Sequence, residues 1–116
     1  MDRVSRDHDV TVIEFGPSYD SLNETALTET GGVLLGEAVH AEPPRLLLDL
    51  SGTRFIGSRF IELLVRAWKR LKQRGGTMAL CGLQPFCSDV LHSTKLDTVW
   101  DCYPTRADGV TALADR

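Results

Sequence analysis

The stretch RLLLDLSGTRFIGSRFIELLVRAWKRLKQRGG, residues 45–76, decides the fold of this chain. Its first six residues form a nearly continuous apolar run of strand length, which is typical of a strand buried on both faces of a sheet. After a short connection, Ser58 opens a periodic segment that predicts a helix to about Arg74, closed by two glycines. The stretch therefore predicts a buried strand followed by a long helix.

The predicted helix has one broad apolar face opposite its charged residues. This face is wider than contact with a single sheet requires, and we interpret most of it as core. Phe60, in the first turn, is the residue of this face that we expect to reach the surface. The apolar residues of the face are Phe60, Ile61, Leu63, Leu64, Val65, Ala67, Trp68 and Leu71.

The alternation of strands and helices continues on both sides of this stretch. Before it, the pattern predicts a strand over residues 10–15 and a helix over residues 22–40, with a second short strand around residues 20–22 as an open alternative. After it, the predicted elements are a strand over 77–81, a helix over 84–93, a strand over 98–103 and a helix over 106–114. This order predicts an α/β fold, a mixed and partly parallel sheet of four or five strands with covering helices, in a single domain spanning residues 1–116.

Composition and charge exclude several classes of function. With 116 residues, of which 42% are hydrophobic, the chain can bury one core but is too short for two ordinary domains. Its formal net charge of −3 offers no basic surface for phosphate backbones, so we expect no nucleic-acid partner. No apolar stretch approaches the roughly 20 residues of a membrane span, and residues 1–10 are too polar for a signal peptide. We therefore expect a cytoplasmic protein without direct membrane insertion.

The reactive side chains show no pattern typical of a metal centre or an active site. Cys81, Cys87 and Cys102 match none of the paired zinc or redox spacings, and we interpret them as buried free thiols. The three histidines are scattered singly along the chain. A phosphate-binding glycine loop and a nucleophile elbow are also missing from the sequence. We therefore expect no cofactor, no metal site and no enzymatic activity.

Several short motifs follow one another within residues 45–100. In this combination and order they resemble the bacterial anti-sigma-factor antagonist family, whose fold is the STAS domain. The resemblance covers about half of the chain and implies a STAS-like fold. The motifs are Asp49-Leu50 at the end of the apolar strand, Ser51-Gly52, Phe55-Ile56, Ser58 at the helix start, Arg74-Gly75-Gly76 at its end, and Lys95-Leu96-Asp97 before the last predicted strand.

The resemblance implies a regulator that works by reversible protein binding. In this family, a kinase-type anti-sigma factor phosphorylates the serine at the start of this helix, and the unmodified form binds the kinase and releases the sigma factor. Ser58 occupies that position here. A phosphate there would meet unpaired backbone N–H groups and the positive end of the helix dipole, while adding about 1.5 to 2 negative charges. The open alternative is that Ser58 is an N-cap that contributes about 1 kcal/mol to helix stability.

The turn before the helix departs from the usual Asp-Ser-Ser-Gly of the family. It reads Gly57-Ser58-Arg59-Phe60, so the carboxylate, the second small residue and the glycine are replaced. This departure predicts altered partner contacts. It favours an alternative function, a non-phosphorylated STAS subunit of a transporter or a signalling assembly.

The candidate site residues gather around this turn. Asp49 lies at a strand end, where parallel sheets tend to bind ligands, although a hydrogen bond to the following turn is the alternative. Thr53 and Arg54 lie in the connecting loop, where plain solvation would also explain them. The expected partner is an anti-sigma factor or a related serine kinase, and the oligomeric state stays open. The predicted phosphorylation site is Ser58, and the predicted partner-binding residues are Asp49, Thr53, Arg54, Gly57, Arg59 and Phe60.

Overall fold

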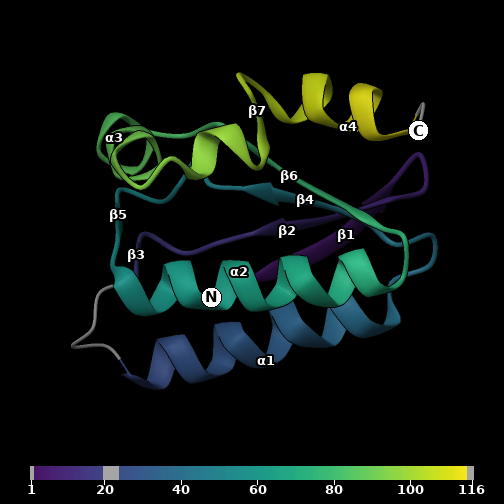
Figure 1. Cartoon of the computed structure of the whole chain (residues 1–116), viewed down its shortest axis with the longest axis horizontal. Coiled ribbons are helices and arrows are strands. Elements are labelled where there is room, and N and C mark those ends of the chain that lie inside the picture. Colours follow the sequence, from purple (N-terminus) through teal and green to yellow (C-terminus); the bar gives the residue numbers. More distant parts are fainter. Residues whose placement is uncertain (1, 20–23, 115–116) are drawn as a thin grey trace.

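The elements keep the predicted order of strands and helices, with three additional strands (Figure 1). The computed structural model describes residues 2–19 and 24–114. The strands are β1 (Arg3–Asp7), β2 (Val10–Glu14), β3 (Ser18–Tyr19), β4 (Arg45–Asp49), β5 (Phe55–Ile56), β6 (Thr77–Cys81) and β7 (Asp101–Tyr103). The helices are α1 (Glu24–His40), α2 (Ser58–Gln73), α3 (Pro85–Ser93) and α4 (Arg106–Ala114), with a short 3-10 helix η1 (Leu96–Thr98).

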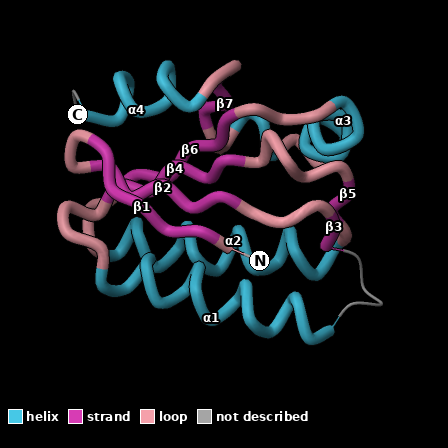
Figure 2. Tube along the Cα trace, turned by 180° about the vertical axis from the view of Figure 1, so that it is seen from behind, coloured by secondary structure: helices cyan, strands magenta, loops and turns pink. Residues whose placement is uncertain are grey.

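Five strands form one mixed sheet in the order β1-β2-β4-β6-β7. β1 runs antiparallel to β2, and the other neighbouring pairs are parallel. Helices α1 and α2 cover one face of the sheet and α4 covers the other, so the central strands are buried on both sides (Figures 1 and 2). The prediction of an α/β domain with a mixed sheet of four or five strands is confirmed.

Helix α2 supplies the centre of the larger core. Phe60, Leu64, Ala67 and Leu71 recur at helical spacing and are fully buried. The other four apolar residues of the predicted face are partly buried against the same core. The broad apolar face of α2 is therefore core, as most of it was expected to be.

The expectation that Phe60 reaches the surface is wrong, because its side chain is 0% exposed. Its ring stacks on Tyr19 with the centroids 4.8 Å apart and meets the ring of Phe15 edge-on at 5.4 Å. These two partners come from β3 and from the residue that follows β2, far from Phe60 in sequence. The first turn of α2 thus rests on an aromatic cluster made of Phe15, Tyr19 and Phe60.

The sequence pattern placed some strands wrongly. β1, β3 and β5 were not predicted, and they are short or only partly buried. The predicted strand over residues 98–103 is too long, since residues 96–98 form η1 and only Asp101–Tyr103 pairs with β6. Trp100, which the pattern assigned to this strand, instead packs into the core before β7 begins. The alternative strand over residues 20–22 lies outside the described residues, as does the predicted start of the first helix at residue 22.

Arg74, the C-cap residue of α2, also holds the end of α1. Its guanidinium donates hydrogen bonds to the carbonyl oxygens of Ala38 at 3.0 Å and Ala41 at 2.6 Å. It also lies 2.9 Å from the carboxylate of Glu42. Carbonyl groups at a helix C-terminus lack partners within the helix, and a cation there interacts favourably with the dipole. Arg74 therefore links the C-terminal ends of the two helices that cover this face.

We expect Arg74→Ala to lower the free energy of unfolding by about 1–2 kcal/mol, because it removes two hydrogen bonds from a charged donor. The pair with Glu42 adds little, since that carboxylate is 76% exposed. Urea unfolding followed by circular dichroism measures the change. Arg70→Ala, an exposed arginine in the same last turn, is the control and should change stability by less than about 0.5 kcal/mol. Equal effects of the two substitutions would contradict the linking role of Arg74.

Candidate functional site

The start of α2 lies near the end of the molecule where β3, β5 and α3 gather (Figure 1). The connection from β4 to α2 is fixed there by hydrogen bonds to residues 16–19. Because these bonds involve two backbone N–H groups and one side chain of the connection, they fix the position of the start of α2 relative to residues 16–19. The bonds run from Thr53 Oγ1 to the Gly16 carbonyl at 2.7 Å, from Arg54 N–H to the Pro17 carbonyl at 2.8 Å, and from Gly57 N–H to the Tyr19 carbonyl at 2.8 Å.

The hydroxyl group of Tyr19 also stabilises residues 16–19, to which the connection is bonded. The hydroxyl donates to a carboxylate oxygen of Asp2 at 2.7 Å and accepts a bond from the N–H of Gly16. Burial, followed by the hydrogen bond to Asp2, raises the pKa of Tyr19 to about 12. The phenol therefore stays neutral and keeps its proton for the bond to Asp2.

Ser58 is the first residue of α2 and is exposed. Gly57 is the N-cap residue, with extended backbone angles of φ −106° and ψ −179°, and no side chain caps the first turn. The alternative in which Ser58 is the N-cap is therefore wrong, because its hydroxyl lies one residue too far into the helix. The Ser58 hydroxyl therefore belongs to the first turn of a helix whose N-terminal N–H groups receive no side-chain cap, in the positive field of the helix dipole.

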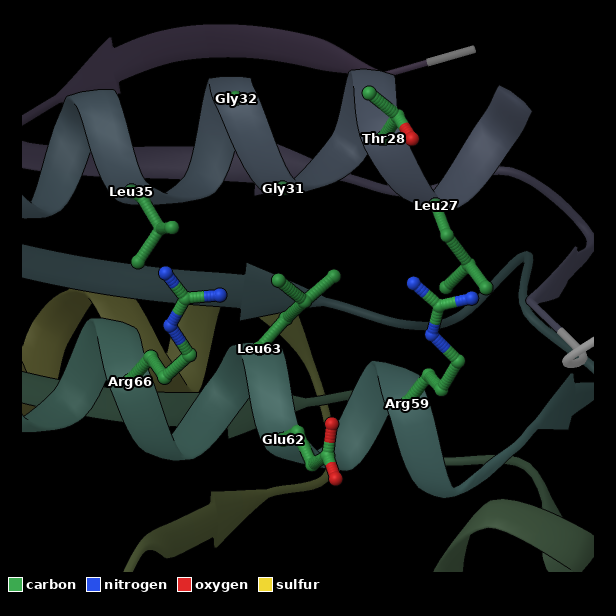
Figure 3. Close-up of a pocket in the computed structure, with 9 residues that line it drawn as sticks. All are labelled: Leu27, Thr28, Gly31, Gly32, Leu35, Arg59, Glu62, Leu63 and Arg66. Atoms are coloured by element: carbon green, nitrogen blue, oxygen red, sulfur yellow. The ribbon is translucent and has the colours of Figure 1, made fainter. Parts of the chain in front are cut away.

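Arg59 reaches from α2 towards α1. Its Nη1 lies 3.1 Å from a carboxylate oxygen of Glu24, but both side chains are more than half exposed, so this pair adds little stability. Figure 3 shows Arg59 and Arg66 extending from α2 towards α1 on either side of Leu63. They border a hollow of about 340 Å³ lined by Leu27, Thr28, Gly31, Gly32, Leu35, Arg59, Glu62, Leu63 and Arg66. Arg59 thus belongs to the side of the helix start that faces α1.

Two other predicted partner-binding residues are buried. Asp49 is 9% exposed, and its carboxylate accepts a hydrogen bond of 3.0 Å from the N–H of Ser51, so the alternative role in the following turn is confirmed. Thr53 is 0% exposed, which excludes plain solvation as its explanation. Its carbonyl accepts a bond of 3.5 Å from the thiol of Cys87. Asp49, Thr53 and the buried Phe60 position the site, whereas Arg54, Ser58 and Arg59 are exposed on it.

The sequence analysis missed an exposed aromatic pair beside this site. Phe55 of β5 is 37% exposed and Phe86 of α3 is 45% exposed, and their rings stack with the centroids 4.9 Å apart. Exposed aromatic residues are enriched at the centres of protein interfaces. Helical periodicity carried one signal, since the buried residues of α3 are Cys87 and Leu91, four positions apart, and Phe86 falls outside that stripe.

The cysteines agree only in part with the expected buried free thiols. Cys81 and Cys87 are buried and free, but Cys102 is exposed because it lies on β7 at the edge of the sheet. Burial, together with the nearby carboxylate of Asp49, raises the pKa of the Cys81 thiol to about 12, so this thiol stays neutral.

Within residues 2–19 and 24–114, no three His, Cys, Asp or Glu side chains are grouped so that they could hold a metal ion. The described helices include none that is long and apolar enough to cross a bilayer.

Comparisons with known proteins find the same architecture. The family model of the STAS domain matches residues 6–109. A STAS domain protein from Planctomyces limnophilus, solved as an anti-sigma-factor antagonist, is 39% identical and has a TM-score of 0.85, with 97% of each chain covered. An anti-sigma factor antagonist from Mycobacterium paratuberculosis is 26% identical, with a TM-score of 0.79 over 97% of this chain and 92% of the other. SpoIIAA from Bacillus, solved in its phosphorylated form, shares the fold at 13% identity, with a TM-score of 0.73 over 97% and 98% of the two chains. The search of curated proteins gives no significant match.

Proposed function

Because this chain belongs to the STAS domain family, we propose that it is an anti-sigma-factor antagonist that binds an anti-sigma factor or a related serine kinase. It acts in the bacterial cytoplasm by reversible protein binding and not by catalysis. The contact is made by the start of α2 and its surroundings. We name this surface the docking surface and define it as Arg54, Phe55, Gly57, Ser58, Arg59 and Phe86.

The observation that carries the proposal is the combination of an exposed serine at an uncapped helix start with an exposed aromatic pair. Interfaces gain most of their affinity from a few well-packed aromatic and arginine side chains. Phe55 and Phe86 offer such an aromatic anchor, and Arg54 offers an exposed cation next to it in sequence. The buried loop contacts hold these groups in place before binding, which reduces the ordering cost of association.

Phosphorylation of Ser58 would act as the switch. The phosphate would be stabilised by the N-terminal N–H groups of α2, where it would place about 1.5 to 2 negative charges on the docking surface. A partner that fits the unmodified surface, with its exposed Arg54 and Arg59, would then meet repulsion and a desolvation cost. Binding of the unmodified form and release of the phosphorylated form follow from this change of charge.

We expect Ser58→Asp to weaken binding at least about tenfold, a loss of about 1.4 kcal/mol, whereas Ser58→Ala should bind like the unmodified protein within about threefold. Isothermal titration calorimetry against each purified serine-kinase anti-sigma factor of the source genome measures both affinities. Thr111→Asp is the matched control, because it adds the same charge on α4, across the sheet from α2. If Ser58→Asp and Thr111→Asp bind equally well to the partner, the docking surface does not lie at the start of α2.

The phosphate itself can be located without ambiguity. Trypsin should release the peptide FIGSR, residues 55–59, and Ser58 carries its only hydroxyl group. Mass spectrometry of the chain after incubation with the binding kinase and ATP should show one phosphate on this peptide. Unmodified peptide at full coverage, from a chain that binds the same kinase, would reject the phosphorylation switch while leaving the binding partner in place.

The alternative is a STAS subunit of a transporter or signalling assembly that is not phosphorylated. One observation favours it, namely that bulky residues follow Ser58, with Arg59 extending towards Glu24 and Phe60 buried in the aromatic cluster. A kinase that needs small residues after the serine would be blocked by this turn. Stable co-purification of the unphosphorylated chain with one assembly, from stressed and unstressed cells alike, would establish this alternative.

A further inference from the structure

β1 is an edge strand of the sheet (Figure 2). It pairs with β2 along one side, and in the described part of the chain no strand pairs with its other side. An edge strand carries a row of N–H and C=O groups that can pair with a strand of another chain. The side chains of β1, whose sequence is RVSRD, determine which partner strand can pair with it.

The turn after β1 determines which of its backbone groups face outward. His8 and Asp9 have φ angles of 49° and 65° and form a two-residue connection between β1 and β2. These angles fit a type I′ hairpin turn. In a hydrogen-bonded turn the first residue accepts a bond from the fourth, so the carbonyl of Asp7 faces the N–H of Val10 on β2.

Backbone groups alternate in direction along a strand. Asp7, Ser5 and Arg3 therefore direct their N–H and C=O groups towards β2, whereas Val4 and Arg6 direct theirs away from the sheet. An incoming strand would bond to Val4 and Arg6. The N–H and C=O groups of Val4 and Arg6 form no hydrogen bonds with β2.

We propose that β1 pairs antiparallel with β1 of a second copy of this chain, about a two-fold axis that passes beside Ser5. In this register Val4 lies opposite Arg6 of the second copy, and the two residues exchange both N–H···O bonds. By symmetry, Arg6 lies opposite Val4 of the second copy and exchanges the same two bonds. The two sheets then continue as one across the dimer.

The charges of β1 are complementary to themselves in this register. Arg3 lies opposite Asp7 of the second copy, and Asp7 lies opposite Arg3 of that copy. These positions do not exchange backbone bonds, so their Cα atoms approach to about 4.5 Å and the side chains come close. Arg3 is exposed and the side chain of Asp7 is 39% exposed, so both can reach the second copy. One carboxylate oxygen of Asp7 lies 2.6 Å from Nδ1 of its neighbour His8, and the pair with Arg3 of the second copy uses the other oxygen. Edge strands are often protected from pairing by like charges that repel an incoming strand. In this register, by contrast, Arg3 and Asp7 of the two copies attract each other.

Contacts within the chain hold two other charged side chains of this hairpin, those of Arg6 and Glu14, away from this pairing. Arg6 donates a hydrogen bond of 2.6 Å to the carbonyl of Glu42, which holds its guanidinium against its own chain. Glu14, which lies opposite Arg3 on β2, is engaged by Arg106 at 2.8 Å. Val4, which is 43% exposed, adds apolar surface that would be covered in the dimer. The contacts of Arg6 and Glu14 and the exposure of Val4 are thus compatible with pairing of β1 to a second copy.

Exchange of charges between two variants tests the register directly. Sedimentation velocity of the wild-type chain from about 5 µM to about 1 mM should show a dimer with a dissociation constant on the order of 100 µM, since a five-residue strand pair is a small interface. Arg3→Asp places carboxylates opposite each other, and Asp7→Arg places guanidinium groups opposite each other, so each variant alone should dimerise at least about tenfold more weakly. An equimolar mixture of the two variants should recover the wild-type affinity, because every pair is then of opposite charge.

Two further variants separate this pairing from other causes. Lys69→Asp makes the same change of charge on the exposed face of α2 and should dimerise like the wild type. Val4→Pro removes an outward N–H that β2 does not use, so the chain should keep its melting temperature within a few degrees and lose the dimer. A wild-type chain that stays monomeric to about 1 mM, or a mixture no tighter than its two components, would overturn the proposal. Neither result bears on the docking surface, which is built on other elements.

Discussion

Phe60→Ala is expected to lower the free energy of unfolding by about 3–5 kcal/mol, the loss typical of a buried aromatic side chain. Phe60 is 0% exposed and makes ring contacts with both Phe15 and Tyr19. Truncation would leave a cavity beneath the start of α2, where fixed loop contacts hinder collapse. Urea unfolding monitored by circular dichroism measures the loss.

The control for this substitution is Phe86→Ala, which removes the same atoms from a ring that is 45% exposed. We expect it to cost less than about 1 kcal/mol of stability, because the ring keeps water contact in the folded chain. Its effect should appear instead in partner binding. Equal losses of stability at Phe60 and Phe86 would contradict the distinction between the aromatic cluster and the docking surface.

Gly76→Ala is expected to cost about 2–3 kcal/mol, the upper part of the range for overpacking. A Cβ atom at this position would lie 2.5 Å from the carbonyl oxygen of Pro44, closer than real Cβ atoms approach. That carbonyl cannot retreat without strain, because it accepts a bond of 2.9 Å from the N–H of Thr77 at the start of β6. Thermal and urea unfolding of the variant measure the cost.

A glycine of α1 provides the opposite expectation. Gly32→Ala places a Cβ atom where nothing lies within 4 Å, so the higher helix propensity of alanine should stabilise the chain by about 0.5–1 kcal/mol. The two substitutions add the same methyl group and should differ in sign. Stabilisation by alanine at both positions would show that the chain around Gly76 yields more readily than this geometry implies.

Much of the fold follows from local pattern. The apolar run at residues 45–50 and the periodic segment after it predicted β4 and α2, because burial on both faces and amphipathic periodicity leave different signatures in sequence. The glycines after Arg74 predicted the end of α2 for an equally local reason, since Gly75 adopts a φ of 71° that other residues rarely adopt. The short strands β3 and β5 were missed because two residues carry no period.

The candidate site could be predicted only in its location. The motif order placed it at the start of α2, but the N-cap proved to be Gly57, and Thr53, Asp49 and Phe60 proved to be buried. A one-residue shift at a helix start is invisible to propensity, because several residue types are accepted at both positions. Ser58 is consequently an exposed residue of the first helical turn and does not have the capping role that was the alternative to a phosphorylation site.

The sequence by itself determined the layered α/β fold and the family, and it located the region where we propose that a partner binds. Tertiary structure alone decided which of the aromatic rings are core and which are surface, pairing Phe60 with Tyr19 but leaving Phe55 stacked on Phe86 in contact with solvent. The physical reason is that periodicity shows which residues share a face of their own element. Burial depends on what the rest of the chain, distant in sequence, places opposite that face.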